Sequence, residues 1–288
     1  MFYVQILING LVLGGLYACI AVGFSLVWGV LNVINILHGT FVVLGSFLAY
    51  FAYVRLGIHP IVSMVLSGAA LFLLGYAIQV GIINRVIGAP VLTTLVLTFG
   101  LDLIANNSAL LAFSADYRTL ELANPLGSVT IGGIVLPLAR VVVTALAVAL
   151  TALLYFVLVR STIGRAIVAV RMDGEAAALM GVNVEQIYAI TFGIGALMAG
   201  VSGSLLAVIF PISPLNSTEF LGIAFVVCVL GGLGSILGAL VGGLVLGVIQ
   251  NFGAWLIGPQ HGLTIAFLLL ILLFIFKPTG ILGRSGYE

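Results

Sequence analysis

The sequence predicts an all-α protein, a polytopic bundle of about eight to nine transmembrane helices that forms a single domain over residues 1–288. Of these residues, 63% are hydrophobic and only 6% are charged, whereas a soluble domain carries about 25% charged residues. So few charges cannot cover a surface that faces water, and the outside must therefore face membrane lipid. The net charge is +1 and the basic residues are scattered singly, which argues against nucleic acid as a partner.

The individual spans follow from apolar runs of roughly 20 residues, the length that crosses a bilayer as a helix. The first run has neither a basic segment before it nor a small-residue cleavage site after it, so it is expected to be retained as a span. The polar stretches are 84–90, 114–133, 160–186, 211–220 and the tail from Lys277. The predicted spans are 4–29, 36–54, 60–83, 91–113, 134–159, 187–210, 221–233 with 237–257, and 262–276.

The distribution of basic residues predicts the orientation, because short loops rich in arginine and lysine stay on the cytoplasmic side. If 160–186 lies inside, most basic residues also lie inside. The inside set is Arg85, Arg160, Arg165, Arg171, Lys277 and Arg284, and the outside set is Arg55, Arg118 and Arg140. This choice predicts an external N-terminus and a cytoplasmic C-terminus, provided that 221–257 crosses the membrane twice.

Glycines mark the turn between those two crossings. The turn is predicted at Gly231-Gly232-Leu233-Gly234-Ser235, and Gly234, Gly238 and Gly242 recur every four residues. Such a stripe lets helix backbones approach closely. Two interpretations stay open: packing between helices within the chain, or a seam or broken helix pair that acts as a gate beside a pathway.

Missing residues exclude several enzyme classes. Lys277 is the one lysine and is followed by proline, so the chain has no P-loop and cannot bind ATP in that way. No H-E-x-x-H motif occurs, and His38, His59 and His261 are far apart in sequence. We therefore expect no catalytic residues, no metal site and no cofactor held by this chain.

One weak enzymatic motif is present. Gly200-Val201-Ser202-Gly203 matches the G-x-S-G of intramembrane serine proteases, with His261 as a conceivable base. Small residues surround it, so a packing face is the favoured interpretation.

A polar stripe lies in the span 91–113. Thr94, Thr98, Asp102 and Asn106 follow a spacing of four and so share one helix face. An ionisable group at membrane depth is costly and commonly marks a pathway. The stripe is therefore either a hydrogen-bonded strut between helices or the lining of a substrate path, in which the Asp102 carboxylate could bind an ammonium group.

The stretch 160–186 is longer than a turn requires. Asp173 is a plausible N-cap for a short helix over Glu175–Met180, and Gly181 supplies the stop. A second helix start follows, where Asn183 and Gln186 have capping-box spacing. A short helix held along the cytoplasmic face can serve as a binding site for a soluble partner.

These residues resemble those of a known family. Glu175-Ala176-Ala177-x-x-x-Gly181 looks like the EAA loop of bacterial ABC importer permeases. Three other stretches resemble the branched-chain amino-acid (LivH-type) branch of that family, and with the loop they span nearly the whole chain. They are Asn35-Ile36-Leu37-His38-Gly39, Val229 to Ile236 with Gly238, and Lys277 to Gly283.

The resemblance implies a permease subunit that moves branched-chain or related amino acids across the bacterial inner membrane by alternating access. It implies as partners two cytoplasmic ATPases that hold ATP and Mg²⁺, a second homologous permease, and a periplasmic binding protein that docks near 114–133 and 211–220. Relatives in this branch are thought to carry urea or short amides as well, so that cargo is an alternative. A secondary transporter or channel is a further alternative, and the intramembrane protease is the least favoured.

The same resemblance implies a coupling role for the cytoplasmic loop. In that interpretation Arg165 and Glu175 orient the docking helix, Ala176 and Ala177 let it sit close to the ATPase, and Gly181 permits the return turn. The full set of predicted coupling residues is Gly164, Arg165, Asp173, Glu175, Ala176, Ala177, Met180 and Gly181.

Overall fold

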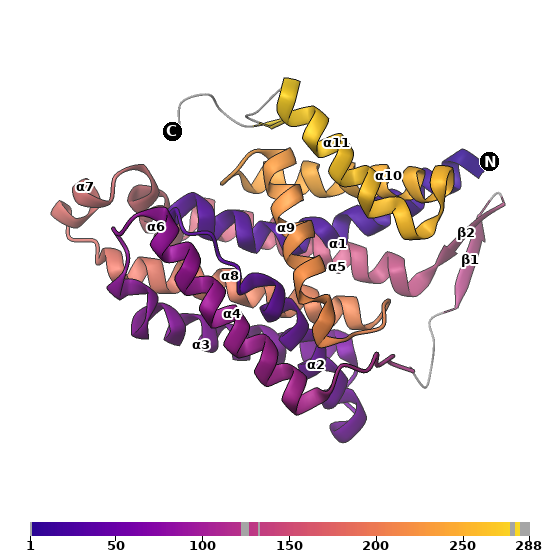
Figure 1. Ribbon diagram of the computed structural model, residues 1–288, viewed down its shortest axis with the longest axis horizontal. Coiled ribbons are helices and arrows are strands. Elements are labelled where there is room, and N and C mark those ends of the chain that lie inside the picture. Colours follow the sequence, from indigo (N-terminus) through magenta and orange to yellow (C-terminus); the bar gives the residue numbers. More distant parts are fainter. Residues whose placement is uncertain (1, 122–126, 132, 277–279, 283–288) are drawn as a thin grey trace.

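The chain folds into a helical bundle with one small hairpin (Figure 1). The computed structural model describes residues 2–121, 127–131, 133–276 and 280–282. The long helices are α1 (Phe2–Leu31), α2 (His38–Leu56), α3 (Pro60–Gly81), α4 (Val91–Phe113), α5 (Leu138–Arg160), α8 (Val184–Ala207), α9 (Ser217–Gly231) and α10 (Ile236–Ile257). The shorter elements are η1 (Ile83–Arg85), β1 (Ser128–Ile131), β2 (Ile134–Pro137), α6 (Thr162–Met172), α7 (Gly174–Leu179), η2 (Pro214–Asn216), η3 (Pro259–His261) and α11 (Gly262–Phe276).

The number of spans agrees with the prediction. Within the described ranges, eight helices are long and apolar enough to cross a membrane, and the apolar α11 is shorter. The segments on either side of the glycine turn, α9 with η2 and α10, both qualify as separate spans. The condition set for the predicted orientation, two crossings over 221–257, is therefore consistent with the structure.

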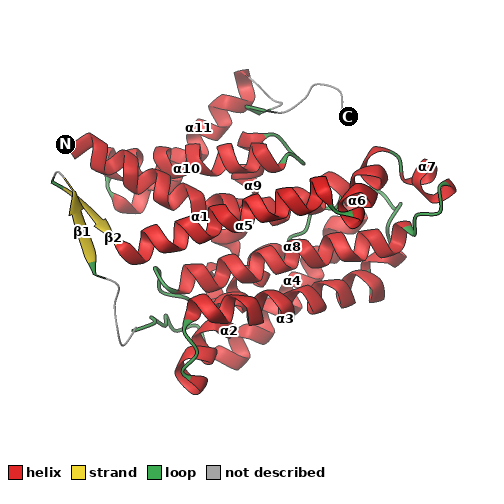
Figure 2. Cartoon of the chain, turned by 180° about the vertical axis from the view of Figure 1, so that it is seen from behind, coloured by secondary structure: helices red, strands yellow, loops and turns green. Residues whose placement is uncertain are grey.

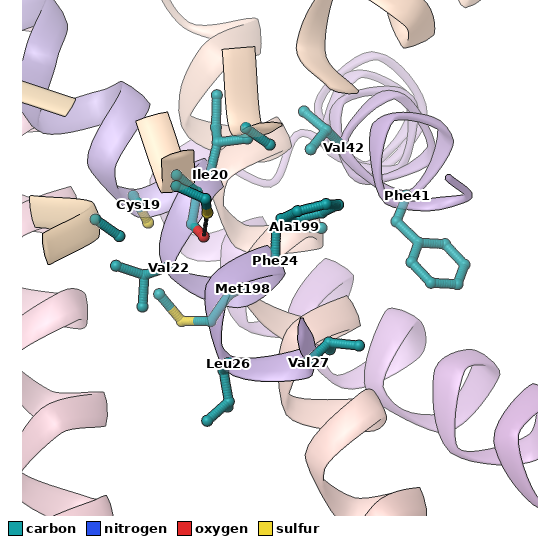
Figure 3. Packing of buried hydrophobic residues seen from close by; sticks show 14 of the residues in the cluster. Cys19, Ile20, Val22, Phe24, Leu26, Val27, Phe41, Val42, Met198 and Ala199 are labelled. Carbon is teal, nitrogen blue, oxygen red and sulfur yellow. Dashed lines mark hydrogen bonds between the residues drawn. The ribbon is translucent and has the colours of Figure 1, made fainter. Parts of the chain in front are cut away.

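Helix α1 forms the centre of the bundle. It has 30 residues, about 45 Å at 1.5 Å per residue, and contacts α10, α8, α5 and α9. Its side chains Cys19, Ile20, Val22, Phe24, Leu26 and Val27 belong to the same buried apolar cluster as Phe41 and Val42 of α2 and Met198 of α8 (Figure 3). An apolar core around a central helix leaves the outer helices to face lipid.

Small residues bring α1 and α10 into backbone contact. A Cβ added at Gly14 would lie 2.6 Å from the Leu244 Cα, and one added at Gly243 would lie 2.5 Å from the Ala18 backbone nitrogen. Neither position has room for a side chain, so the two helices approach as closely as glycine allows.

The chain between α1 and α2 turns back into the bundle, which the sequence did not predict. The span predicted at 36–54 begins as a helix only at His38, and Asn32 has a positive φ of 52°. The His38 Nε2 lies 2.9 Å from the carbonyl oxygen of Ile20, which is 11 residues, or about 16 Å, before the end of α1. Residues 33–37 therefore run inward as irregular backbone that is buried or half-buried in the protein, the setting in which such backbone is tolerated at membrane depth.

The span predicted at 134–159 was wrong at its start. Residues 134–137 form β2, which pairs antiparallel with β1 with Ser128 opposite Pro137. The turn includes Gly133, whose φ is +84°. Helix α5 begins directly after Pro137, because a proline is well placed just before or at a helix start but cannot donate inside it.

Two other parts of the structure differ from the predicted boundaries. The helix predicted over 187–210 starts earlier, at Val184, and ends at Ala207. The stretch 160–186 contains a complete extra helix, α6, that the prediction had treated as loop.

Candidate functional site

The loop between α5 and α8 forms a projecting end of the bundle, with α7 at its tip (Figure 2). The α5–α6 junction is tight: the Gly164 backbone N–H donates to the Ser161 Oγ at 2.9 Å. A Cβ at Gly164 would collide with the Leu158 backbone. Glycine is therefore required where the chain bends from the membrane helix into the loop.

The capping pattern predicted for α7 and α8 is confirmed. The Ala176 N–H donates to the Asp173 Oδ1 at 2.9 Å, and the Gln186 N–H donates to the Asn183 Oδ1 at 3.0 Å. Gly181 lies between the two helices with a φ of +86°. Side-chain caps and a left-handed glycine thus fix the short helix and its return turn.

The two faces of α7 differ sharply in exposure. Leu179 and Met180 are 89% and 85% exposed, whereas Ala177 is only 5% exposed and belongs to the core. The methyl group of Ala177 packs inside the chain, so a role for this residue in seating the helix against the ATPase has no support from its contacts and stays a prediction. Ala176 and Glu175 are exposed and stay available for contact.

Helix α6 carries the loop back to the bundle. Its buried residues Gly164, Ile167 and Val170 lie at spacings of three, so one face packs inward. The exposed Arg165 side chain lies near the end of α5, where its Nη1 donates to the Arg160 carbonyl oxygen at 3.5 Å. The role predicted for Arg165 in orienting α7 has no support from this contact and stays a prediction.

The C-terminal end of α6 meets the glycine turn. A Cβ added at Gly234 would lie 2.9 Å from the Gly29 Cα and 3.3 Å from the Arg171 Nη2. The end of α1, the α9–α10 turn and the end of α6 thus share one small region.

The glycine stripe serves packing within the chain. Gly231 and Gly238 bring the backbones of α9 and α10 together, and a Cβ at Gly242 would meet the Val227 carbonyl. Gly232 and Gly234 have φ values of +105° and +76°. These glycines therefore pack closely against other parts of the same chain. A gating role for them stays a prediction.

The C-terminal segment also reaches this turn, which sequence reasoning missed. The Ile281 N–H donates to the Leu230 carbonyl at 2.8 Å, and the Leu282 N–H donates to the Gly231 carbonyl at 3.1 Å. These bonds satisfy carbonyls that the end of α9 would leave unpaired. Lys277, Pro278, Thr279, Gly283 and Arg284, which belonged to the sequence predictions, lie outside the described residues.

The polar stripe on α4 faces the inward-running segment and α2. The Thr98 Oγ1 donates to the Ile34 carbonyl at 2.7 Å, and the Thr40 Oγ1 donates to the Asp102 Oδ1 at 2.6 Å. The strut interpretation is therefore confirmed for these contacts. Thr94 is buried and donates to the Val91 carbonyl, while the Asn106 Oδ1 is buried with no hydrogen-bond partner among the described residues. A role for the stripe in a substrate path stays a prediction.

The two polar stretches predicted to lie outside come together at the opposite end from α7. Arg118 and Ile212 exchange backbone hydrogen bonds of 2.9 and 2.8 Å, and the Ser213 Oγ donates to the Ala115 carbonyl at 3.0 Å. Part of 114–133 thus pairs with part of 211–220.

The chain resembles known proteins over its whole length. The family described as the branched-chain amino acid transport system permease component matches residues 6–276. The chain belongs to this family. It is 34% identical to the high-affinity branched-chain amino acid transport system permease protein BraD of Pseudomonas aeruginosa, with 99% of this chain and 97% of the relative covered.

Two further relatives agree with this assignment. The permease is 32% identical to LivH of Escherichia coli K12, covering 100% of this chain and 98% of the relative. It is 26% identical to a probable LivH of Methanocaldococcus jannaschii, covering 97% and 92%. No solved structure matches it. The protein is a multi-pass membrane subunit of an ABC import system, the transport component rather than the one that hydrolyses ATP, and it works with ATPase and binding-protein partners.

The permease does not assemble the weak protease motif. Ser202 is fully buried in α8, where its hydroxyl donates to the Ala199 carbonyl at 2.9 Å, while His261 is exposed on η3. No hydrogen bond joins the two within the described ranges. The three histidines likewise form no metal-binding cluster among the residues that were described.

Proposed function

We propose that this permease imports branched-chain or closely related amino acids by alternating access, with its N-terminus in the periplasm and its C-terminus in the cytoplasm of a bacterial inner membrane. The observation that carries the proposal is the full-length family match. The names of the similar BraD and LivH proteins specify branched-chain amino acids, and the distribution of arginines supports the orientation.

In this orientation α6 and α7 face the cytoplasm, where two ATPases bind ATP and Mg²⁺. The exposed tip formed by Leu179 and Met180 supports docking there, because large apolar side chains exposed at the tip of a water-facing loop commonly mark an interaction site. Closure of the ATPases would move the loop as a rigid piece, since caps and Gly164 fix its geometry. The contact of Arg171 with the Gly234 region then passes that movement to α1.

The substrate path would form between this permease and a second homologous one. Helix α4 supports that arrangement, because only Thr94, Thr98 and Ala109 of this helix are buried within the chain, while Asp102 is half-buried. A half-exposed carboxylate is costly against lipid and is better accommodated beside another protein surface or a hydrated path.

The test is uptake into proteoliposomes that hold the permease and its partner permease, the ATPases and a saturating binding protein. ATP-dependent accumulation of labelled leucine, isoleucine or valine is the expected result. Accumulation of urea but not of these amino acids would reassign the cargo. Uptake that persists without nucleotide would contradict an ATP-driven importer.

A further inference from the structure

A cavity of about 200 Å³ opens at the end of the bundle opposite α7. Its walls come from the beginnings of α1 and α5, the last part of α10 and the chain just after α8. Figure 1 shows the N-terminus, the start of α5 beside β2 and the end of α10 side by side at this end. The residues that matter for its chemistry are Asn9, Leu13, Leu16, Arg140, Phe210 and Asn251.

Arg140 supplies a positive charge to the cavity. It lies in the first turn of α5, where the helix dipole is positive and a cation is unfavourable. Over the described ranges, no hydrogen bond or ion pair engages its guanidinium, so its donors are available. A guanidinium that lines a small cavity binds a carboxylate well, because its donors match the two oxygens.

Two side-chain amides complete the polar part. The Asn251 Nδ2 donates to the Gly247 carbonyl at 3.0 Å, which leaves its Oδ1 as an acceptor. The Asn9 Oδ1 accepts from the Gln5 Nε2 at 3.1 Å. Gln5 is itself held by the Val135 backbone, with bonds of 2.9 and 2.8 Å. The amides are therefore positioned before any ligand arrives, and they offer acceptors to an ammonium group.

The rest of the lining is aliphatic or aromatic. Leu13 and Leu16 come from one face of α1, and Phe210 closes the other side. Among the lining residues that the structure describes, none carries a carboxylate, so a cationic side chain would find no counter-charge from them. The volume equals that of several water molecules at about 30 Å³ each, which suits a small molecule rather than a lipid with two acyl chains.

We propose that this cavity is a substrate-binding site for a small zwitterionic amino acid with an aliphatic side chain. Arg140 binds the carboxylate, the Asn251 and Asn9 amide oxygens accept from the ammonium group, and Leu13, Leu16 and Phe210 contact the side chain. The proposal rests on the proposed function, since it places the site on the side where the binding protein releases substrate. It adds a receiving site that precedes passage through the bundle.

The test uses a photoreactive diazirine analogue of leucine with the intact permease–ATPase complex in phosphatidylcholine nanodiscs. Crosslinks should map to peptides that contain Leu13 and Leu16 or Phe210, and excess leucine should suppress them. Arg140→Gln should lower the yield at least about tenfold, because it removes the charge-assisted hydrogen bonds to the carboxylate. Arg140→Lys should retain part of the yield.

Arg55→Gln is the matched control. It removes one positive charge from an arginine that lies over the Phe51 ring, 5.1 Å from the ring centroid, outside the cavity lining. The crosslinking yield should equal that of the wild type. Equal yields from Arg140→Gln and the wild type, or crosslinks elsewhere only, would overturn the proposal.

A second arm distinguishes an anionic lipid headgroup from the amino acid. The measurement is repeated in nanodiscs that contain phosphatidylglycerol. If the lipid abolishes the leucine crosslink, the cavity is a headgroup site and the proposal is wrong. ATP-driven uptake by the wild type, measured in proteoliposomes from the same preparation, tests the proposed function separately. If Arg140→Gln keeps both this uptake and the wild-type crosslinking yield, the proposed cavity site is wrong while the proposed function stands.

Discussion

Replacing Leu179 by serine tests whether α7 is the docking point for the ATPase. Leu179 is 89% exposed in the permease, so the change should alter its own stability by less than about 0.5 kcal/mol. A partner that covers this side chain would gain about 1.5–3 kcal/mol from its burial. Loss of that gain weakens docking by about tenfold to a hundredfold, since 1.4 kcal/mol is a tenfold change. Met180→Ser, at 85% exposed, should act in the same direction.

The assay is the Kd between nanodisc-embedded permease and its purified ATPase, together with the rate of transport per ATP hydrolysed. Leu56→Ser is the control, because Leu56 is a 68% exposed leucine at the end of α2, away from α7. It should leave the Kd unchanged. Wild-type affinity in both Leu179→Ser and Met180→Ser would refute docking through this tip.

Three other substitutions test the packing that supports the site. Ala177→Trp inserts a large ring at a residue that is 5% exposed, so the Tm of the purified permease should fall, with a cost of about 1–3 kcal/mol; an unchanged Tm would show that the position is open. Gly231→Ala forces a methyl group against the α10 backbone and should reduce the monodisperse fraction in size-exclusion chromatography, whereas Gly100→Ala, with nothing within 4 Å, should not; equal profiles would contradict the close approach. Thr40→Val removes the donor to Asp102 and should lower the free energy of unfolding by about 1.5–3 kcal/mol, measured by thermal unfolding. A Tm equal to that of the wild type would contradict the interpretation of this hydrogen bond as a strut between helices.

Local chemistry made the caps of α7 and α8 and the turn between them predictable. Asp173, Gly181 and Asn183 each act through hydrogen bonds or backbone conformation within a few residues, so their pattern carries the information. The spans were predictable for a similar reason, because length and apolarity alone decide them.

Features that depend on distant contacts were not predictable. The inward turn before His38 is held by the hydrogen bond between the His38 Nε2 and the Ile20 carbonyl oxygen. No sequence pattern predicts this contact. Helix α6 was missed because two arginines made 162–172 look like loop, although Ile167 and Val170 pack inward. The hairpin was missed because Ile134 to Pro137 is as apolar as the helix that follows it.

The burial of Ala177 shows the limit of motif-based inference. The resemblance marks the residue, and the structure shows that it supports α7 from inside, while Leu179 and Met180 provide the outer surface. A residue that a motif marks can therefore lie beneath an exposed surface and support it from inside.

The central claim is that α7 lies in the cytoplasm, where an ATPase can move it. The direct test is a cysteine in place of Met180, labelled with a membrane-impermeant maleimide, in a chain whose own cysteines, Cys19 and Cys228, are buried. The account predicts labelling in inside-out vesicles, protection when the ATPase is bound, and no labelling in intact right-side-out spheroplasts. Labelling from the periplasmic side would contradict it.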